Sequence, residues 1–332
     1  MLRYLVQRLL LMIPTIFLIS VATFVIIQLP PGNYLDTMIS DLRASGEKVD
    51  LQKVEFLKKQ FGLDQPLWKQ YWMWFSGLLH GDLGYSFEYD RPVSEIIGER
   101  LALNFVVSFA AIVFTWLVAF PIGVYSATHQ YSWADHSLTF LGFLGLATPN
   151  FLLALVLMFV SFTFFGTSVG GLFSPDMQAA PWSWAKVGDL LAHLWIPVVI
   201  IGASGTAGMI RRLRANLLDE LRKQYVVTAR AKGLPPRRVL LKYPLRIALN
   251  PFISDIGNLL PQVFSGAVIV SIVLSLPIMG PVLLRALRSQ DMYLAGSFLM
   301  FLAVLTVIGV FLSDLALAAL DPRIRQGAGQ SR

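Results

Sequence analysis

The sequence has no cysteine, which excludes disulfide bonds, thiolate metal ligands and thiol nucleophiles. Charge is scarce as well: only 14% of the 332 residues are Asp, Glu, Lys or Arg, against about 25% in a soluble domain. The uncharged residues are gathered in long runs, several of them near or above the roughly 20 residues that cross a bilayer. We therefore interpret the chain as a membrane protein with several spans.

Sequence signatures of catalysis are also missing. The chain has no G-x-x-x-x-G-K-[ST] loop for nucleotide phosphates and no G-x-S-x-G turn for a serine nucleophile. Its four histidines, His80, His129, His136 and His193, lack metal-ligand spacing, and we interpret the pair in ATHQYSWADH as solvated loop residues. We therefore expect that this chain is not an enzyme and binds no cofactor or metal ion.

Six apolar runs predict an all-α polytopic membrane protein with six transmembrane helices. The third and fifth runs exceed the bilayer thickness, and Pro149 and Pro277 are candidate kinks within them. Arg3 and Arg8 precede a first run that is too long for the core of a cleaved signal peptide. The predicted spans are residues 9–29, 101–125, 137–165, 190–210, 253–282 and 294–314.

The loops between these runs differ in charge. Residues 30–100 contain eight Lys/Arg and eleven Asp/Glu, whereas residues 211–251 contain eleven Lys/Arg and two Asp/Glu. Because basic loops near span ends stay in the cytoplasm, we expect 211–251 and both termini to be cytoplasmic. The net charge of +7 comes from this loop, so it indicates orientation in the membrane and not binding of nucleic acid.

Residues 30–100 are predicted to form an extracytoplasmic helical insertion between the first two transmembrane helices. EKVDLQKVEFLKKQFGL has apolar residues at helical spacing, and PLWKQYWMWFSGLLHGDLGYSF follows with Pro66 near a helix start. The aromatic residues of this second stretch suit either an interfacial belt or a cap that packs on the spans. The expected division is 1–29 for the N-terminus and first span, 30–100 for the cap, 101–320 for the five-span core with its loop 211–251, and 321–332 for a tail.

Two acidic residues fall within the predicted spans, and they define an alternative function. An ion-driven secondary carrier needs ionisable groups inside the membrane. Asp255, in NPFISDIGN, and Asp314 both lie near predicted membrane edges, where water or an arginine can reach them. We favour a structural role for both and keep the ion-driven carrier as the alternative of another class.

The basic loop has the pattern of a helical hairpin over residues 216–246. DELRKQYVVTARAKG predicts one helix, with its acids in the first turn and Gly233 just past its end. Pro236 can open a second helix, RRVLLKYPLRIALN. Ala229 and Gly233 share a face with Tyr225, where another backbone could approach closely. A loop that only fixes orientation explains the charge but not this face, which favours insertion into a groove on a cytosolic partner.

QYVVTARAKGL resembles the cytoplasmic coupling motif of binding-protein-dependent ABC importer permeases. More narrowly, it is similar to the motif of the dipeptide/oligopeptide/nickel permease family, in the type of its first permease (DppB/OppB-like). The resemblance covers nearly the whole chain. MLRYLVQRLLLMIPTIFLISVATFVIIQLPPG, FGLDQPLWKQYWMWFSGLLHGDLGYSF, PVSEIIGERL, ATPNFLLALVLM and LDPRIR match in the expected order. The chain departs from the general motif of the family at two places. Where the motif has Glu-Ala-Ala, this chain has Val227-Thr228-Ala229, and where the motif later has Ile-x-Leu-Pro, this chain has Tyr243-Pro244-Leu245-Arg246.

The resemblance implies the subunit of an ATP-driven importer in a bacterial or archaeal cytoplasmic (inner) membrane. A homologous second permease would complete the pathway, two ATPase subunits would bind ATP and Mg²⁺, and a periplasmic or lipid-anchored binding protein would deliver substrate. Membrane lipid would surround the spans. The residues that would couple to the ATPase are Tyr225, Thr228, Ala229, Arg230, Ala231, Lys232, Gly233 and Leu234.

Within that family the resemblance favours peptides as substrate over oligosaccharides or opines. Trp116, Trp182, Trp184 and Trp195 could stack on sugars or aromatic side chains, or could equally lie at the membrane interface. Nickel is less favoured, because the spans contain no cluster of His or Cys ligands.

Overall fold

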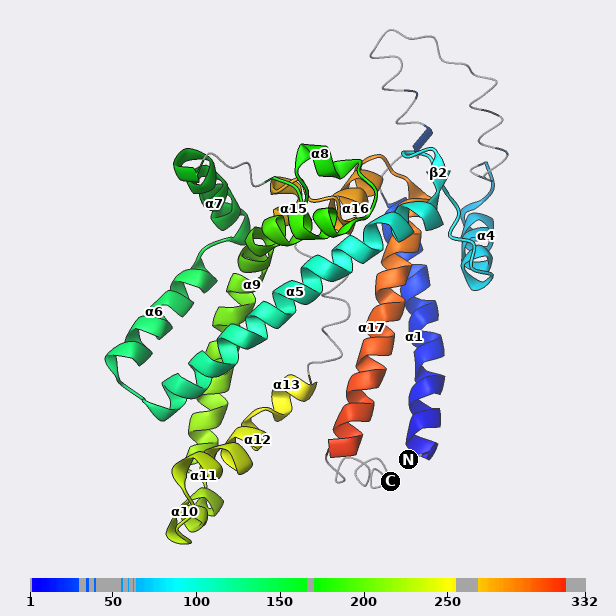
Figure 1. Cartoon of the computed structure of the whole chain (residues 1–332). Helices are drawn as coiled ribbons and strands as arrows, with labels where there is room; N and C mark the ends of the chain where they lie inside the picture. The colour runs from blue at the N-terminus through cyan, green and yellow to red at the C-terminus, as the bar shows by residue number, and fades with distance from the viewer. Residues whose placement is uncertain are drawn as a thin grey trace.

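In the computed structural model, long helices run between two ends of the molecule, and a two-stranded β-hairpin lies at one of them (Figure 1). The structure describes residues 2–29, 64–165, 170–254 and 268–320, with a few single positions between 34 and 62. The long helices are α1 (Leu2–Gln28), α5 (Val93–Thr128), α6 (Trp133–Ala147), α7 (Asn150–Phe165), α9 (Trp184–Leu221) and α17 (Met292–Leu320).

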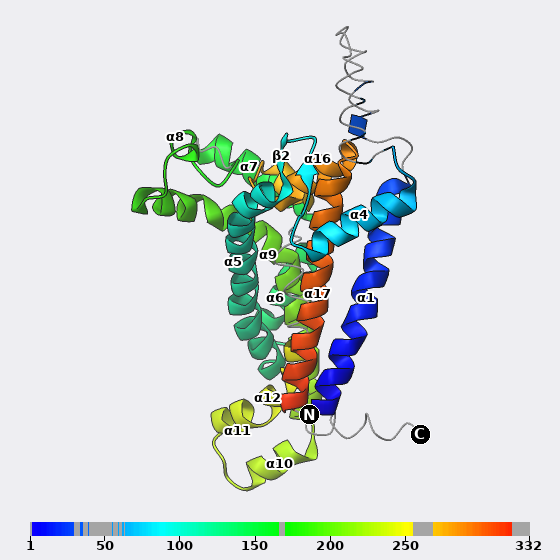
Figure 2. The same ribbon diagram turned by 90° about the vertical axis from the view of Figure 1, so that its right-hand side faces the viewer.

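The short elements gather at the two ends of the long helices, as Figures 1 and 2 show. The cap end, as we call it, carries α4 (Leu67–Leu79), β1 (Tyr85–Ser86), β2 (Arg91–Pro92), α8 (Pro175–Gln178), α15 (Val268–Val273) and α16 (Met279–Arg288). The hairpin end carries α10 (Gln224–Ala231), α11 (Pro236–Lys242), α12 (Pro244–Ala248) and α13 (Asn250–Ser254), and the N-terminus lies at the same end.

Among the described residues, four helices are long and apolar enough to cross a membrane: α1, α5, α9 and α17. The bent pair α6 and α7 makes a fifth if it is counted as one span. An all-α membrane protein is thereby confirmed. Of the fifth predicted span, residues 253–282, the structure describes 253–254 and 268–282, and the second part forms α15, a turn and the start of α16. Asp255 and most of the amphipathic stretch before residue 62 lie outside the described residues, so the six-span count stays a prediction.

Two helices are longer than the sequence predicted. Residues 93–100, assigned above to the cap, are the first two turns of α5, and residues 211–221, assigned to the basic loop, are the last turns of α9. The start of α5 is held by packing, because Val93, Ile96 and Ile97 are buried against α16 and α17. Neither extension contains a proline, so nothing in the backbone stops the helix at the membrane surface.

Both predicted kink points lie at helix breaks. α6 ends before Thr148, Pro149 follows, and α7 continues at an angle of 100° to it. Pro277 lies in the turn between α15 and α16. In each case the missing N–H and the restricted residue before proline oppose a continuous helix.

α5 and α9 pack together along most of their length, and small residues let the two backbones approach. A Cβ added to Gly202 would come 2.7 Å from Cδ1 of Phe114, and one added to Gly123 would come 3.0 Å from Cδ2 of Leu213. Thr115 also donates a hydrogen bond across the contact to the carbonyl of Gly202, at 3.3 Å. The two helices therefore lie in hard contact.

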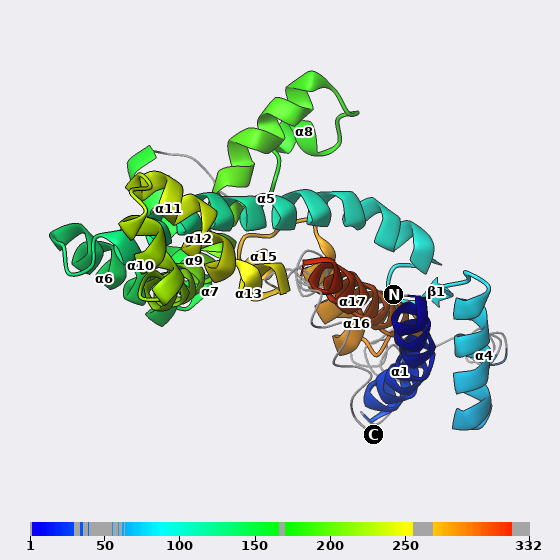
Figure 3. The same ribbon diagram turned by 90° about the horizontal axis from the view of Figure 1, so that it is seen from below.

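α1 and α17 form a second helix pair, which Figure 3 shows beside α4. Trp74 of α4 is buried against Phe24 of α1, and the Tyr71 hydroxyl lies 2.8 Å from Ser20 Oγ. Trp68 on the same helix is 72% exposed. One face of the aromatic stretch therefore packs on the spans, as expected of a cap, while a role of its exposed face at the membrane interface stays a prediction.

A buried carboxylate joins the β-hairpin to the start of α17. Asp291 has no exposed surface, and it accepts hydrogen bonds from Ser86 Oγ at 2.6 Å and from the backbone N–H groups of Glu88 and Leu294, each at 3.1 Å. The bond from Leu294 caps the helix, because it satisfies one of the N–H groups that have no partner inside α17. The cap end is therefore tied to the membrane helices.

Candidate functional site

The candidate site is the helix–turn–helix of α10 and α11, which projects beyond the ends of the long helices (Figure 2). α10 ends at Ala231, Lys232 is its C-cap, and Gly233 follows with φ +73°. That left-handed backbone is open to glycine without a steric cost. Pro236 then occupies the first turn of α11, where a missing N–H costs nothing. The turn predicted from Gly233 and Pro236 is confirmed.

A small apolar core closes the hairpin. Val226 is fully buried, Ala229 is 5% exposed and Val239 is 2% exposed, so α10 and α11 meet through these three side chains. Tyr225, Leu234 and Tyr243 pack around them. Because this contact bridges the two helices, the hairpin has its own tertiary structure instead of depending on helix propensity alone.

The contact corrects one part of the sequence interpretation. We expected Ala229 to face a partner, but it packs inside the hairpin, because its side chain lies one helical turn from Val226 and opposite Val239. Tyr225 and Leu234 are half-buried for the same reason. The candidate residues that the structure leaves exposed are Thr228, Arg230, Ala231, Lys232 and Gly233. Val227, at the position of the motif's glutamate, lies beside them and is 50% exposed.

The helix boundaries differ from the prediction as well. α9 runs on to Leu221, and a break at residues 222–223 separates it from α10, so Asp219 and Glu220 lie in the last turn of α9 and not in the first turn of the hairpin. Glu220 is held there by a short hydrogen bond that the Tyr225 hydroxyl donates to Oε2. Burial raises the pKa of Tyr225, and the Glu220 carboxylate raises it further, so the phenol stays protonated and keeps the bond.

The second predicted helix is also divided. Tyr243 has φ −114° and ψ −82°, outside helical values, and it separates α11 from α12. The cause is Pro244, because proline disfavours the helical conformation of the residue before it. The short helices α12 and α13 then lead back to the membrane helices.

α12 and α13 anchor the hairpin to the bundle. Ala248 and Phe252 are buried against Leu213 and Leu217 of α9. Phe252 also makes an edge contact with Phe120 of α5, with 5.7 Å between ring centroids. A displacement of the hairpin must therefore move the adjoining parts of α9 and α5, because packed apolar contacts do not stretch.

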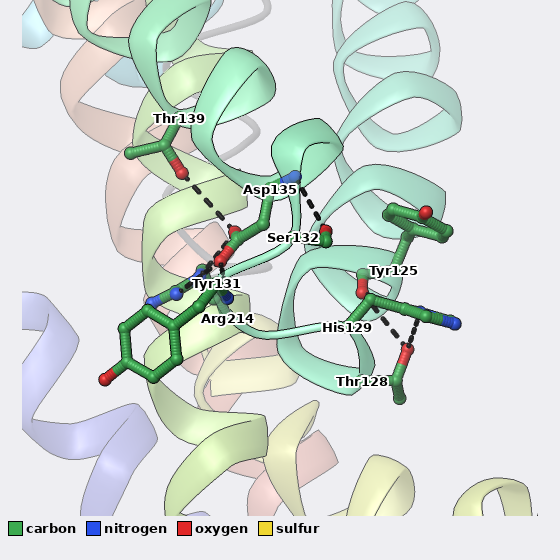
Figure 4. Close-up of polar contacts among 8 residues, drawn as sticks. All are labelled: Tyr125, Thr128, His129, Tyr131, Ser132, Asp135, Thr139 and Arg214. Atoms are coloured by element: carbon green, nitrogen blue, oxygen red, sulfur yellow. Dashed lines mark hydrogen bonds and ion pairs between the residues drawn. The ribbon is translucent and has the colours of Figure 1, made fainter.

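An ion pair adds α6 to the same unit, as Figure 4 shows. Arg214 of α9 donates two hydrogen bonds to Asp135, from Nε to Oδ1 at 3.0 Å and from Nη2 to Oδ2 at 2.8 Å. The Asp135 side chain is 2% exposed and that of Arg214 is 26% exposed. The backbone N–H of Tyr131 donates to Asp135 Oδ2 at 3.0 Å, and Ser132 Oγ caps α6 by accepting from the Asp135 N–H at 3.1 Å. We call Asp135 and Arg214 the α6–α9 clamp.

Sequence reasoning missed the clamp. Ser132 and Asp135 have the spacing of a helix N-cap, which was available as a signal for the start of α6. Arg214 was counted only as one of the eleven basic residues of 211–251 that indicate orientation. Nothing in one sequence shows that two residues 79 positions apart meet.

The electrostatic character of the hairpin is strongly basic. It carries no acidic residue between 224 and 246, and its six cationic side chains are exposed. Such a surface favours a partner with acidic groups around its binding groove, because complementary charge steers association. The exposed cations are Arg230, Lys232, Arg237, Arg238, Lys242 and Arg246.

The other candidate residues lie away from the hairpin core. His129, the C-cap of α5, stacks on Tyr125 with 4.4 Å between ring centroids, and His136 lies in the first turn of α6. Within the described residues, no three His, Asp or Glu side chains are grouped as metal ligands. Asp314 pairs with Arg8 at 3.1 Å. The four tryptophans do not gather in one place: Trp116 lies within α5, Trp182 and Trp184 lie near the start of α9, and Trp195 lies inside it.

Comparison with known proteins identifies the family. Residues 119–326 match the family described as the inner membrane component of binding-protein-dependent transport systems, and residues 1–110 match the N-terminal part of the membrane component of such systems. The chain belongs to this permease family. The resemblance drawn from the sequence is confirmed, and the chain is a multi-pass membrane component of a binding-protein-dependent transport system.

Curated relatives match the chain over almost its full length. The oligopeptide transport system permease protein AppB of Bacillus subtilis is 32% identical over 97% of this chain and 98% of its own length. The dipeptide transport system permease protein DppB of Escherichia coli K12 is 31% identical over 98% of this chain and 99% of its own length. The glutathione transport system permease protein GsiC of Escherichia coli O6:H1 is 29% identical over 98% of this chain and 99% of its own length. All three are named as permeases, that is, as transport components.

Proposed function

We propose that this permease forms half of the translocation pathway of an ATP-driven peptide importer. The names of the relatives support peptides over oligosaccharides, opines or nickel, because AppB, DppB and GsiC are named for oligopeptide, dipeptide and glutathione transport. A homologous permease would complete the pathway, and two ATPase subunits would bind ATP and Mg²⁺. A periplasmic or lipid-anchored binding protein would deliver the peptide.

The hairpin of residues 216–246 is proposed to be the contact with the ATPase subunit. The observation that carries this role is its shape: an autonomous apolar core leaves Thr228, Arg230, Ala231, Lys232 and Gly233 exposed beyond the bundle. A small, pre-formed helical element of this kind can enter a groove without an ordering cost. The basic charge of residues 211–251 supports a cytoplasmic hairpin end, and the N-terminus then lies in the cytoplasm with it.

In this proposal the cap end faces outward, where the binding protein docks. ATP binding would draw the two ATPase subunits together, and the hairpins would transmit that movement to the spans. The energy for the switch comes from the different affinities of the ATPase for ATP in its two states. The ion-driven carrier is less supported, because Asp314, one of the two acids on which it depends, pairs with Arg8.

The test is Gly233→Asp in the complete transporter. No atom lies within 4 Å of a Cβ at Gly233, so the change adds strain at φ +73° and a negative charge on the exposed surface, without a clash. We expect uptake of peptide to fall at least tenfold while the chain stays in the membrane. Gly81→Asp is the matched control, because Gly81 also has a positive φ, +80°, and open space, but lies between α4 and β1 at the cap end.

Gly233→Asn separates strain from charge, because asparagine tolerates the left-handed backbone better than most residues. It should retain more uptake than Gly233→Asp. Uptake at the wild-type rate by Gly233→Asp would show that the hairpin does not couple transport to ATP. Equal loss in Gly81→Asp would show that the effect is general to strained glycines.

A further inference from the structure

A cavity of about 570 Å³ opens at the cap end, far from the hairpin. Its wall is built by the β1–β2 turn, the first turns of α5, the end of α15 and one side of α16. The volume lies within the range of pockets that hold small ligands. The lining residues are Glu88, Tyr89, Arg100, Ile272, Pro281, Val282, Leu284, Arg285, Arg288 and Ser289.

The charged lining is mainly cationic. Arg100 comes from α5, while Arg285 and Arg288 lie one turn apart on α16 and share a face. The carboxylate that lines the cavity, that of Glu88, lies 3.6 Å from Arg285 Nε, which is a loose ion pair. The three guanidinium groups therefore outnumber the lining carboxylate by two charges.

The nearby acid on α5 does not cancel this charge. Glu99 is held by Arg91, which donates Nη1 to Oε1 at 2.8 Å and Nη2 to Oε2 at 3.0 Å. That bidentate pair occupies both carboxylate oxygens of Glu99. Arg100, its neighbour in sequence, lines the cavity and acts on Glu99 only through its charge, less strongly than Arg91 does.

The remaining wall is apolar and firmly placed. Ile272, Pro281, Val282 and Leu284 supply it. α16 is amphipathic, and its opposite face is held by Met279 and Ala286, both fully buried. The cavity thus combines a cluster of guanidinium groups with an apolar surface on a fixed helix.

We propose that this cavity receives the terminal carboxylate of a peptide, with the apolar wall against the adjoining side chain. The inference rests on the proposed function and names what the cap end recognises. Arginine binds a carboxylate through two parallel N–H···O bonds, and three arginines on two helices can hold it from more than one side. The same charges repel nickel ions and offer no charge complement to a neutral oligosaccharide, so the cavity favours substrates with a carboxylate, a class that includes peptides.

The absence of cysteine from the chain permits a direct test. Ser289→Cys would place a single thiol in the lining of the cavity, in the complete transporter in right-side-out membrane vesicles. Its labelling rate is measured with two methanethiosulfonate reagents, one with a sulfonate and one with a trimethylammonium group, each normalised to its rate with a free thiol. Leu284→Cys is a second reporter in the same wall.

The anionic reagent should react roughly tenfold faster than the cationic one, because an electropositive cleft concentrates anions. Excess trialanine should slow the labelling, and trialanine amide, which lacks the carboxylate, should not. Arg100→Gln and Arg288→Gln should each remove most of the preference and the protection. Lys69→Gln is the matched control, because Lys69 is an exposed cation of α4 at the same end and does not line the cavity.

Equal normalised rates for the two reagents, or equal protection by trialanine and its amide, would overturn the proposal. A third result would assign the arginines to docking of the binding protein instead: trialanine and its amide would both slow the labelling of the thiol, and only when the binding protein is added. Failure of the proposed function looks different: the unmodified transporter would take up no member of a mixed peptide library with ATP, whatever the labelling shows.

Discussion

The α6–α9 clamp offers a quantitative test of how the hairpin end is held together. Arg214→Gln would leave the Asp135 carboxylate, which is 2% exposed, with the Tyr131 N–H and the weaker bond from Thr139 Oγ1 at 3.5 Å. Removing one partner of a buried ion pair costs about 3–5 kcal/mol, because the other charge stays buried without compensation. Since Arg214 is itself 26% exposed, we expect the lower end of this range, about 3 kcal/mol.

The reverse change should cost less. Asp135→Asn leaves Arg214 unpaired, but water reaches its guanidinium, so we expect a loss of about 1–2 kcal/mol. Arg214→Lys keeps the charge and loses the paired geometry, with a loss of about 1 kcal/mol. The double variant Asp135→Asn with Arg214→Gln should be more stable than the sum of the single losses predicts, because neither charge is then left alone.

The assay is the free energy of unfolding of the purified chain in mixed micelles, titrated with SDS. Arg211→Gln is the matched control, because Arg211 lies on the same helix and is exposed. The reasoning would be refuted if Arg214→Gln and Arg211→Gln cost the same within about 0.5 kcal/mol, the usual scatter of surface substitutions. Additive losses in the double variant would likewise show that the two side chains do not interact.

Two further predictions concern apolar contacts. Val226→Ala removes a buried side chain of the hairpin core, so it should destabilise α10 by about 2 kcal/mol and speed hydrogen exchange of the α10 amides. Val227→Ala is the control, because Val227 is next in sequence but 50% exposed, and it should change the exchange rates little. Equal exchange rates in the two variants would mean that α10 does not pack on α11. Gly202→Val should push α5 away from α9, because even a Cβ at this position would lie 2.7 Å from Phe114. The melting temperature of this variant should fall well below that of Gly208→Val, the control, where no atom lies within 4 Å of an added Cβ. Equal melting temperatures would disprove the close contact between α5 and α9.

Local chemistry made parts of the site predictable from sequence. Gly233 and Pro236 each restrict the backbone in one way, so the end of α10 and the start of α11 could be placed without a structure. Long uncharged runs likewise predicted α1, α5, α9 and α17, because hydrocarbon excludes charge and requires internally paired backbone groups.

Contacts that depend on the closed tertiary structure were not predictable. Helical spacing showed that Tyr225 and Ala229 share one side of α10, but not that α11 covers this side through Val239. Spacing also could not find the break at residues 222–223, where no proline or glycine marks the end of α9. The clamp of Asp135 and Arg214 depends on how α6 returns along α9, which a single sequence does not contain.

The two proposed sites are joined by helices that cannot slide independently. α9 has 38 residues, roughly 57 Å of helix, and its far end carries the hairpin. α5 lies against it at Gly202 and Gly123, and the first turns of α5 place Arg100 in the cap-end cavity. If ATP binding at the hairpin end shifts α9, then α5 and its arginine must move too, which changes the affinity for a carboxylate. Coupling between binding sites is reciprocal, so a peptide bound at Arg100 must change the affinity of the ATPase for ATP by the same factor.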